Sequence, residues 1–186
     1  MACTFISKGR KEPCKDVVGG IRAVYFIDDA LAIAFDSSDT DAVDSVGSGI
    51  NAFKYVVKGG SSFEQTITSS RETGTTFYDQ TLTLQFKKLD KDTHQQLALL
   101  AVSLPHVLIE DYNEQVWLMG TENGADVNGG TIVTGTAMGD LSGYTLTLNA
   151  QEKKPANFIH KTAATESAAT TITNAGVTVS STDIDP

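Results

Sequence analysis

Alternation of apolar and polar residues is clearest in the middle of the chain, over residues 63–68 and 77–86. Side chains two residues apart lie on the same face of a strand, so each segment predicts a strand with two unlike faces. The apolar face consists of Phe63, Ile67, Tyr78, Leu82, Leu84 and Phe86. The polar face is rich in threonine, neutral to acidic, and consists of Glu64, Thr66, Thr68, Asp79, Thr81, Thr83 and Gln85. The polar segment 69–76 contains Gly74 for a turn, so the pattern predicts a long two-stranded ribbon.

Shorter segments of strand composition come before and after this ribbon. They are residues 21–27, 31–35, 50–57, 106–110, 114–119, 131–137 and 144–151. Asn123-Gly124 and Asn128-Gly129 are strong turn signals between two of them. Many short strands of this kind are typical of a mainly β fold, here an antiparallel β-sandwich or barrel.

One segment, residues 90–103, has the period of a helix. Asp92 can cap its first turn, with Gln95 three residues later as the partner of a capping box. Its apolar stripe consists of Leu97, Leu100, Ala101 and Leu104. We therefore expect one helix flanking the sheets, packed through Leu97, Leu100 and Leu104.

The chain divides into three parts: an N-terminal arm at 1–19, a β domain at 20–161 and a flexible C-terminal arm at 162–186. Fifteen of the last 25 residues are Ser, Thr or Ala, which is too little apolar volume for a core of its own. Residues 171–180 nevertheless contain Ile172, Val177 and Val179 among threonines. We expect this arm to be mobile in a free subunit and to add a strand to a neighbouring subunit. A tail that stays disordered is the alternative.

Composition and charge narrow the function. The 186 residues carry a net charge of −9, which disfavours tight binding to nucleic acid phosphates or to an anionic membrane surface. The apolar run at 97–104 is far shorter than the roughly 20 residues of a membrane span. Cys3 and Cys14 lie close together near the start and either remain free thiols in a reducing cytoplasm or close a short disulfide.

Known catalytic and nucleotide-binding motifs are missing from the sequence, and we expect no catalytic residue, cofactor or metal. Four aspartates, Asp36, Asp39, Asp41 and Asp44, suggest calcium, but their spacing does not match an EF-hand loop. A solvated acidic loop is the simpler interpretation. Trp117 with Tyr112 nearby would suit a sugar-stacking platform, although a single tryptophan in an apolar strand is more often core.

The ribbon at 63–86 followed at once by the helix resembles the tail-tube proteins of tailed bacteriophages, in particular those of phages infecting Bacteroidetes. The run from Gly135 to Pro155 (GTAMGDLSGYTLTLNAQEKKP) shares the resemblance. It implies a virion structural protein without enzymatic activity, a β-sandwich that forms a homo-oligomeric ring, usually a hexamer, with a dodecamer as the alternative. The ribbons of neighbouring subunits would join into a barrel around a DNA channel.

The implied location is the tail of the virion, after assembly in the host cytoplasm, with other phage tail proteins as partners and no membrane. Tube, terminator, hub and neck ring share the fold, so the role within the tail stays open. Under this interpretation the polar face of the ribbon lines the channel, while its apolar face packs on the subunit. The competing hypothesis is a sugar-binding or adhesin-like β-sandwich that uses Trp117, Tyr112 and the aspartate loop.

Overall fold

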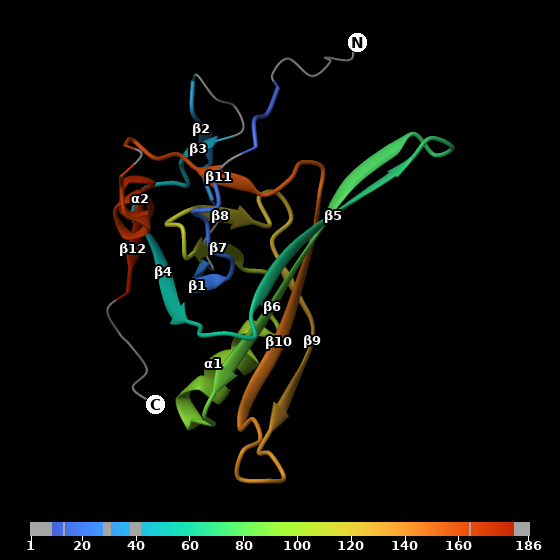
Figure 1. Cartoon of the computed structure of the whole chain (residues 1–186), viewed down its shortest axis with the longest axis vertical. Helices are drawn as coiled ribbons and strands as arrows, with labels where there is room; N and C mark the ends of the chain where they lie inside the picture. The colour runs from blue at the N-terminus through green and yellow to red at the C-terminus, as the bar shows by residue number, and fades with distance from the viewer. Residues whose placement is uncertain (1–8, 13, 28–30, 38–41, 164, 181–186) are drawn as a thin grey trace.

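A computed structural model describes residues 9–12, 14–27, 31–37, 42–163 and 165–180. The fold is mainly β, as predicted, and consists of two sheets (Figure 1). The small sheet has the order β5-β6-β10-β9, and all of its pairs are antiparallel. Its strands are β5 (Ser62–Ser70), β6 (Thr75–Lys87), β10 (Gly143–Glu152) and β9 (Asp126–Val133).

The large sheet has the order β12-β4-β1-β7-β8-β11-β3-β2. Its strands are β1 (Ile21–Ile27), β2 (Ala34–Phe35), β3 (Ala42–Ser45), β4 (Ile50–Val56), β7 (His106–Asp111), β8 (Val116–Met119), β11 (Asn157–Ile159) and β12 (Val177–Val179). Two of its pairs, β11 with β3 and β12 with β4, are parallel, so the sheet is mixed rather than purely antiparallel. The described residues form two helices, α1 (Lys91–Leu100) and α2 (Ala168–Asn174).

The large sheet is curled, because its connections are too short for a flat one. Strands β4 and β3 are five positions apart in the sheet, which in a flat sheet is about 24 Å. Only residues 46–49 join the two strands. The five Cα–Cα steps from the end of β3 to the start of β4 span at most about 17 Å, which is less than a flat sheet would require. The backbone N–H of Val46 donates to the carbonyl of Ala175, at 3.0 Å, which ties the β3 end to the segment before β12.

Each face of the large sheet covers a separate apolar core. The first core lies between the two sheets and includes Val24, Leu84 and Leu148, all fully buried. The second lies inside the curl and includes Tyr25, Leu108 and Ile172. Strand β1 serves both, since its alternate residues point to opposite faces and both faces are buried.

The C-terminal segment is part of the second core, which corrects the expectation of a mobile arm. Ala168, Thr171 and Ile172 on α2 are completely buried, and Val177 is 1% exposed. Strand β12 pairs with β4 of the same chain, with Val177 opposite Ile50. Small residues let α2 sit close to the sheet, so a Ser/Thr/Ala-rich composition here reflects tight packing rather than a tail.

Helix α1 is shorter than predicted and has a different cap. Asp90, not Asp92, is the N-cap, and its carboxylate accepts from the backbone N–H groups of Asp92 and Thr93. Leu97 is buried and Leu100 is partly buried against the first core, but Leu104 lies beyond the helix and is 61% exposed. The helix ends about one turn earlier than predicted, so Leu104 does not belong to the apolar stripe that packs on the core.

Strand β9 begins earlier than the turn signals indicated. Asn128-Gly129 lies inside the strand, where the register passes from Val127 opposite Leu148 to Gly129 opposite Thr147 and leaves Asn128 as the extra residue of a bulge. At Gly130 a Cβ atom would stand 2.5 Å from the carbonyl of Thr145, so glycine is needed for the close pairing with β10.

Candidate functional site in the small sheet

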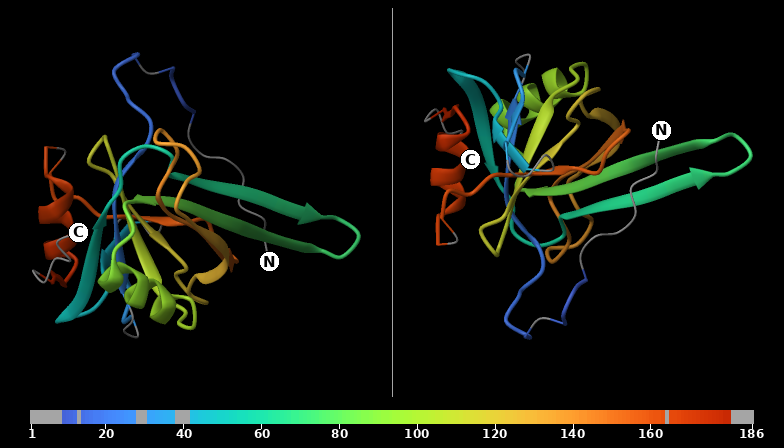
Figure 2. Two further views of the ribbon diagram at one scale, coloured as in Figure 1. Left: turned by 90° about the horizontal axis from the view of Figure 1, so that it is seen from below. Right: turned by 90° about the horizontal axis from the view of Figure 1, so that it is seen from above.

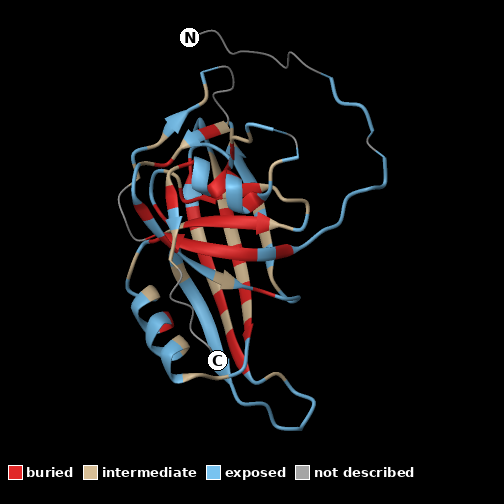
Figure 3. Ribbon diagram, turned by 90° about the vertical axis from the view of Figure 1, so that its left-hand side faces the viewer, coloured by how far each residue is buried: buried red, intermediate tan, exposed pale blue. Residues whose placement is uncertain are grey.

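One face of the small sheet is buried in the first core, as the alternation in sequence predicts. Leu82, Leu84 and Leu148 are completely buried, and Phe86 is 8% exposed. Gln80 lies among them, also completely buried, and its Oε1 accepts the backbone N–H of Gly120 at 3.2 Å. Figure 3 shows the resulting alternation of buried and half-buried residues along the strands.

The opposite face is mostly polar and stays partly or fully exposed, with Phe77 and Val133 as apolar members. It includes Glu64, Thr66 and Thr68 on β5; Asp79, Thr81, Thr83 and Gln85 on β6; Thr145, Thr147, Asn149 and Gln151 on β10. The pairing places threonine opposite threonine, as with Thr83 and Thr147. Asn149 donates to the carboxylate of Asp79 within the face. Lys87, at the end of β6, is its single basic residue in the described strands.

The ribbon extends well beyond the rest of the subunit (Figures 1 and 2). Pairing between β6 and β10 stops at Tyr78 opposite Glu152, whereas β5 and β6 continue together to Ser70 opposite Thr75. Ile67 lies opposite Tyr78, where this pairing with β10 ends, and is 64% exposed, so it does not pack on the subunit's own core as predicted. Alternation identifies the face of a residue, but not whether anything lies beneath that face.

The root of the ribbon is fixed to the large sheet. Phe63 and Tyr78 are half-buried, and the ring of Phe63 lies 6.3 Å from that of Trp117. The backbone N–H of Ala156 donates to Oε1 of Gln65 at 2.8 Å. These contacts hold the direction in which the ribbon projects.

The small sheet has two open edges. Strands β5 and β9 are its outermost strands, and neither has an outer partner in the part of the chain that the structure describes. Ile132 on β9 is 59% exposed and Val133 is 36% exposed. Unpaired edges with apolar side chains promote association with another strand, and soluble proteins normally cover or charge them.

The residues of the sugar-binding hypothesis lie in different surroundings. The Trp117 ring lies 3.9 Å from that of Phe158 as well as near Phe63. Tyr112 packs beside Gly20, where an added Cβ would stand 3.1 Å from its ring. Asp36 faces His160 at 3.5 Å, while Asp39 and Asp41 lie outside the described residues. Trp117 is thus packed against other rings, whereas Tyr112 is 45% exposed and Asp44 is exposed.

Other expectations concern metals, membranes and cysteines. Among the described residues, no three His, Cys, Asp or Glu side chains gather as a metal site, and no helix is long and apolar enough to cross a membrane. Cys14 is an exposed free thiol, and Cys3 lies outside the described residues.

A polar network that the sequence pattern did not predict anchors the C-terminal segment. The hydroxyl of Tyr25 donates to the buried carboxylate of Glu110 at 2.6 Å. Arg22 lies 3.4 Å from Glu110 and 2.6 Å from Glu114. Glu114 also accepts the backbone N–H of Ala168, at 2.8 Å, at the start of α2.

Two pKa values reflect this network. The N–H of Ala168, followed by Arg22, holds the pKa of Glu114 below its ordinary value. Burial, reinforced by the hydrogen bond to Glu110, raises the pKa of Tyr25. Both shifts favour the protonation states that keep the network intact at neutral pH.

Comparison with known proteins gives little. No family model and no curated protein matches the chain. A solved structure titled "Virion of native gene transfer agent (GTA) particle" is 10% identical over 57% of this chain and 89% of that chain, with a TM-score of 0.34. A likeness at this level does not establish a shared fold, so the function is argued from the small sheet itself.

Proposed function

We propose that the chain is a virion structural protein that forms a homo-oligomeric ring, with the small sheets of its subunits joined into a barrel around a DNA channel. The observation that carries the proposal is the form of the small sheet. One face is buried, the other is polar and bare, and both edges are open. A sheet of this form is completed when copies close around an axis, because closure pairs every edge.

Strand directions allow this closure. All pairs in the order β5-β6-β10-β9 are antiparallel, so β5 and β9 run in opposite directions. In a ring every copy has the same orientation along the axis, and β9 of one copy therefore meets β5 of the next as an antiparallel pair. The barrel is then antiparallel throughout.

The width of DNA limits the ring size. Six four-stranded sheets supply 24 strands, and with spacing of about 4.8 Å and tilt up to about 40° the barrel radius is roughly 18–24 Å. Side chains reaching about 5 Å inward leave a channel roughly 26–38 Å wide. B-form DNA, with grooves roughly 8 Å deep, is about 20 Å across. Four copies give about 14–22 Å and twelve give more than about 60 Å, so of these three ring sizes the hexamer fits DNA best.

The chemistry of the bare face suits passage of DNA rather than binding. Threonine, asparagine and glutamine predominate, with carboxylates at Glu64, Asp79 and Asp126, an aromatic ring at Phe77 and one basic residue, Lys87, at the end of β6. Phosphate binding by proteins depends on Lys and Arg, which release counterions. A wall of this composition holds phosphates weakly, as a channel for moving DNA requires.

The resemblance of 63–86, the following helix and 135–155 to phage tail-tube proteins supports a place in the tail of a virion. The partners are then other copies of the chain and other tail proteins, after assembly in the host cytoplasm. Size-exclusion chromatography with light scattering tests the ring. Six copies of the 19.8 kDa chain give about 119 kDa, or filaments of such rings, whereas a monomer at all concentrations would reject the proposal.

A further inference from the structure

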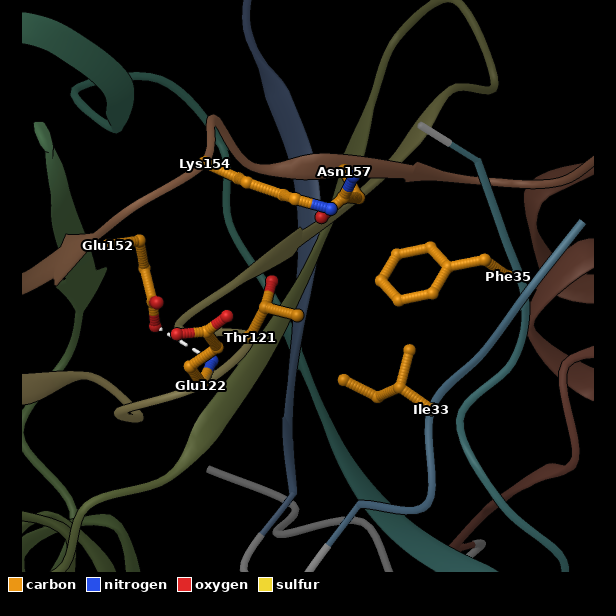
Figure 4. A pocket seen from close by; sticks show the side chains of 7 residues that line it. All are labelled: Ile33, Phe35, Thr121, Glu122, Glu152, Lys154 and Asn157. Carbon is orange, nitrogen blue, oxygen red and sulfur yellow. Dashed lines mark hydrogen bonds between the residues drawn. The ribbon is translucent and has the colours of Figure 1, made fainter. Parts of the chain in front are cut away.

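A pocket opens between the β2 edge of the large sheet and the segment that joins β10 to β11 (Figure 4). Its volume is about 220 Å³, which is room for about seven water molecules or for one to two side chains. It is lined by Ile33, Phe35, Thr121, Glu122, Glu152, Lys154 and Asn157.

The pocket has an acidic side and a basic side. Glu152 is 3% exposed, and its Oε1 accepts the backbone N–H groups of Glu122 and Asn123, both at 2.9 Å. The Glu122 side chain lies beside it. Lys154 has its Nζ 5.2 Å from the centre of the Phe35 ring and has no carboxylate partner among the described residues.

One polar atom in the pocket lacks a partner. The hydroxyl oxygen of Thr121 is buried and makes no hydrogen bond within the described structure. A buried hydroxyl normally has a partner, since leaving it without one is costly. The pocket therefore contains a hydroxyl without a hydrogen-bond partner as well as side chains of opposite charge.

The tip of the ribbon, residues 71–74, carries the complementary charges. Arg71 and Glu72 are adjacent and exposed, and neither forms an ion pair with the rest of the described chain. The turn itself is ordered by hydrogen bonds from the Thr73 N–H to the Ser70 hydroxyl and between the hydroxyls of Thr73 and Thr75. The ordered turn thus presents two opposite charges at a distance from the body of its own subunit (Figure 2).

We infer that the ribbon tip of one copy docks in this pocket of a neighbouring copy. Glu72 then forms an ion pair with Lys154, and Arg71 forms ion pairs with the carboxylates of Glu122 and Glu152. A polar atom of the turn supplies the missing hydrogen-bond partner of the Thr121 hydroxyl. The stems of Arg71 and Glu72 lie against the apolar wall of Phe35, as long charged side chains commonly do. This inference rests on the proposed ring, and it adds a second contact between copies besides the paired sheet edges.

Charge exchange tests the pairing. Glu72→Lys and Lys154→Glu should each weaken association of the subunits about tenfold, measured by sedimentation velocity over a concentration series. The double variant restores the opposite charges and should return to within about threefold of the wild type. Lys91→Glu is the matched control, because Lys91 is exposed on α1, lies outside the pocket and forms no ion pair among the described residues.

The outcomes separate this inference from the proposed function. A wild type that assembles, with single reversals that assemble equally well or a double variant weaker than either, overturns the docking and leaves the ring intact. A monomeric wild type overturns both. If Lys154→Glu does not fold, as judged by circular dichroism, Lys154→Gln and Glu72→Gln replace the reversals, and an unchanged association by both again overturns the docking.

Discussion

Replacing Ile132 by threonine at the outer edge of β9 should weaken the ring without weakening the subunit. Ile132 is 59% exposed in the single chain, and threonine keeps the β-branched shape that suits a strand. If β9 pairs with β5 of a neighbour, most of this exposed apolar surface becomes buried only on assembly. The substitution then removes apolar burial at every contact between subunits.

The magnitude follows from the exposed fraction. Full burial of an isoleucine side chain is worth about 1.5–3 kcal/mol, so 59% of it corresponds to about 1–2 kcal/mol. Threonine retains part of this contact, which leaves a loss of about 1 kcal/mol at each interface. A closed ring of six has six such interfaces, and the total loss is about 6 kcal/mol if they are independent.

Sedimentation velocity over a concentration series measures the assembly, and urea unfolding of the dissociated subunit measures the fold. Val56→Thr is the matched control, because Val56 is 60% exposed on a strand of the large sheet, outside the proposed interface. We expect Ile132→Thr to raise the concentration needed for assembly about five- to tenfold, with subunit stability changed by less than about 0.5 kcal/mol. Equal effects of the two substitutions on assembly would refute the role of the β9 edge.

Further predictions concern the fold and the channel. Leu148→Ala should cost about 2–5 kcal/mol in urea unfolding, whereas Thr147→Ala, on the opposite face of β10, should cost less than about 0.5 kcal/mol; similar costs would mean that the faces are misassigned. Ile172→Ala should also lower the free energy of unfolding of the dissociated subunit by about 2–5 kcal/mol. A negligible loss would mean that the C-terminal segment does not pack in the core. Because the pKa of Glu114 is lowered in the fold, its stabilising contribution is present above the pKa of the unfolded chain and is lost as pH falls through the folded pKa. Glu114→Gln should therefore flatten the acidic side of the stability–pH curve, and an unchanged curve would contradict the anchor. Thr83→Lys should leave assembly intact but make the rings retain DNA at low salt, and rings that still fail to retain DNA would argue against a channel-facing position.

The regular part of the fold was predictable because alternation acts locally. The period-two pattern identifies β6 and β10 and the buried sides of Leu82 and Leu148, since each strand must turn its apolar side to a core. The same pattern misplaced Ile67, because the ribbon runs past the body that would cover it. The periodicity of a sequence shows to which face of a strand a residue points. It does not show how far the neighbouring sheet extends beneath that face.

Tertiary packing explains what the sequence reasoning missed. The C-terminal segment has small residues, such as Ala168 and Ala175, that become core only because the large sheet curls around them. The pocket likewise joins Phe35, Thr121 and Lys154, which are brought together by the sheet order and by no local motif. Neither arrangement leaves a periodic signal in the chain.

Electron cryomicroscopy of the assembled protein would show whether the small sheets of neighbouring subunits close into one barrel. We expect a closed ring of six subunits with one continuous antiparallel barrel, formed by β9 of each copy paired with β5 of the next. Thr83 and Thr147 should face a channel roughly 26–38 Å wide, with Leu82 and Leu84 turned away from it. An assembly held together through other surfaces, or one with Leu82 and Leu84 lining the channel, would contradict it.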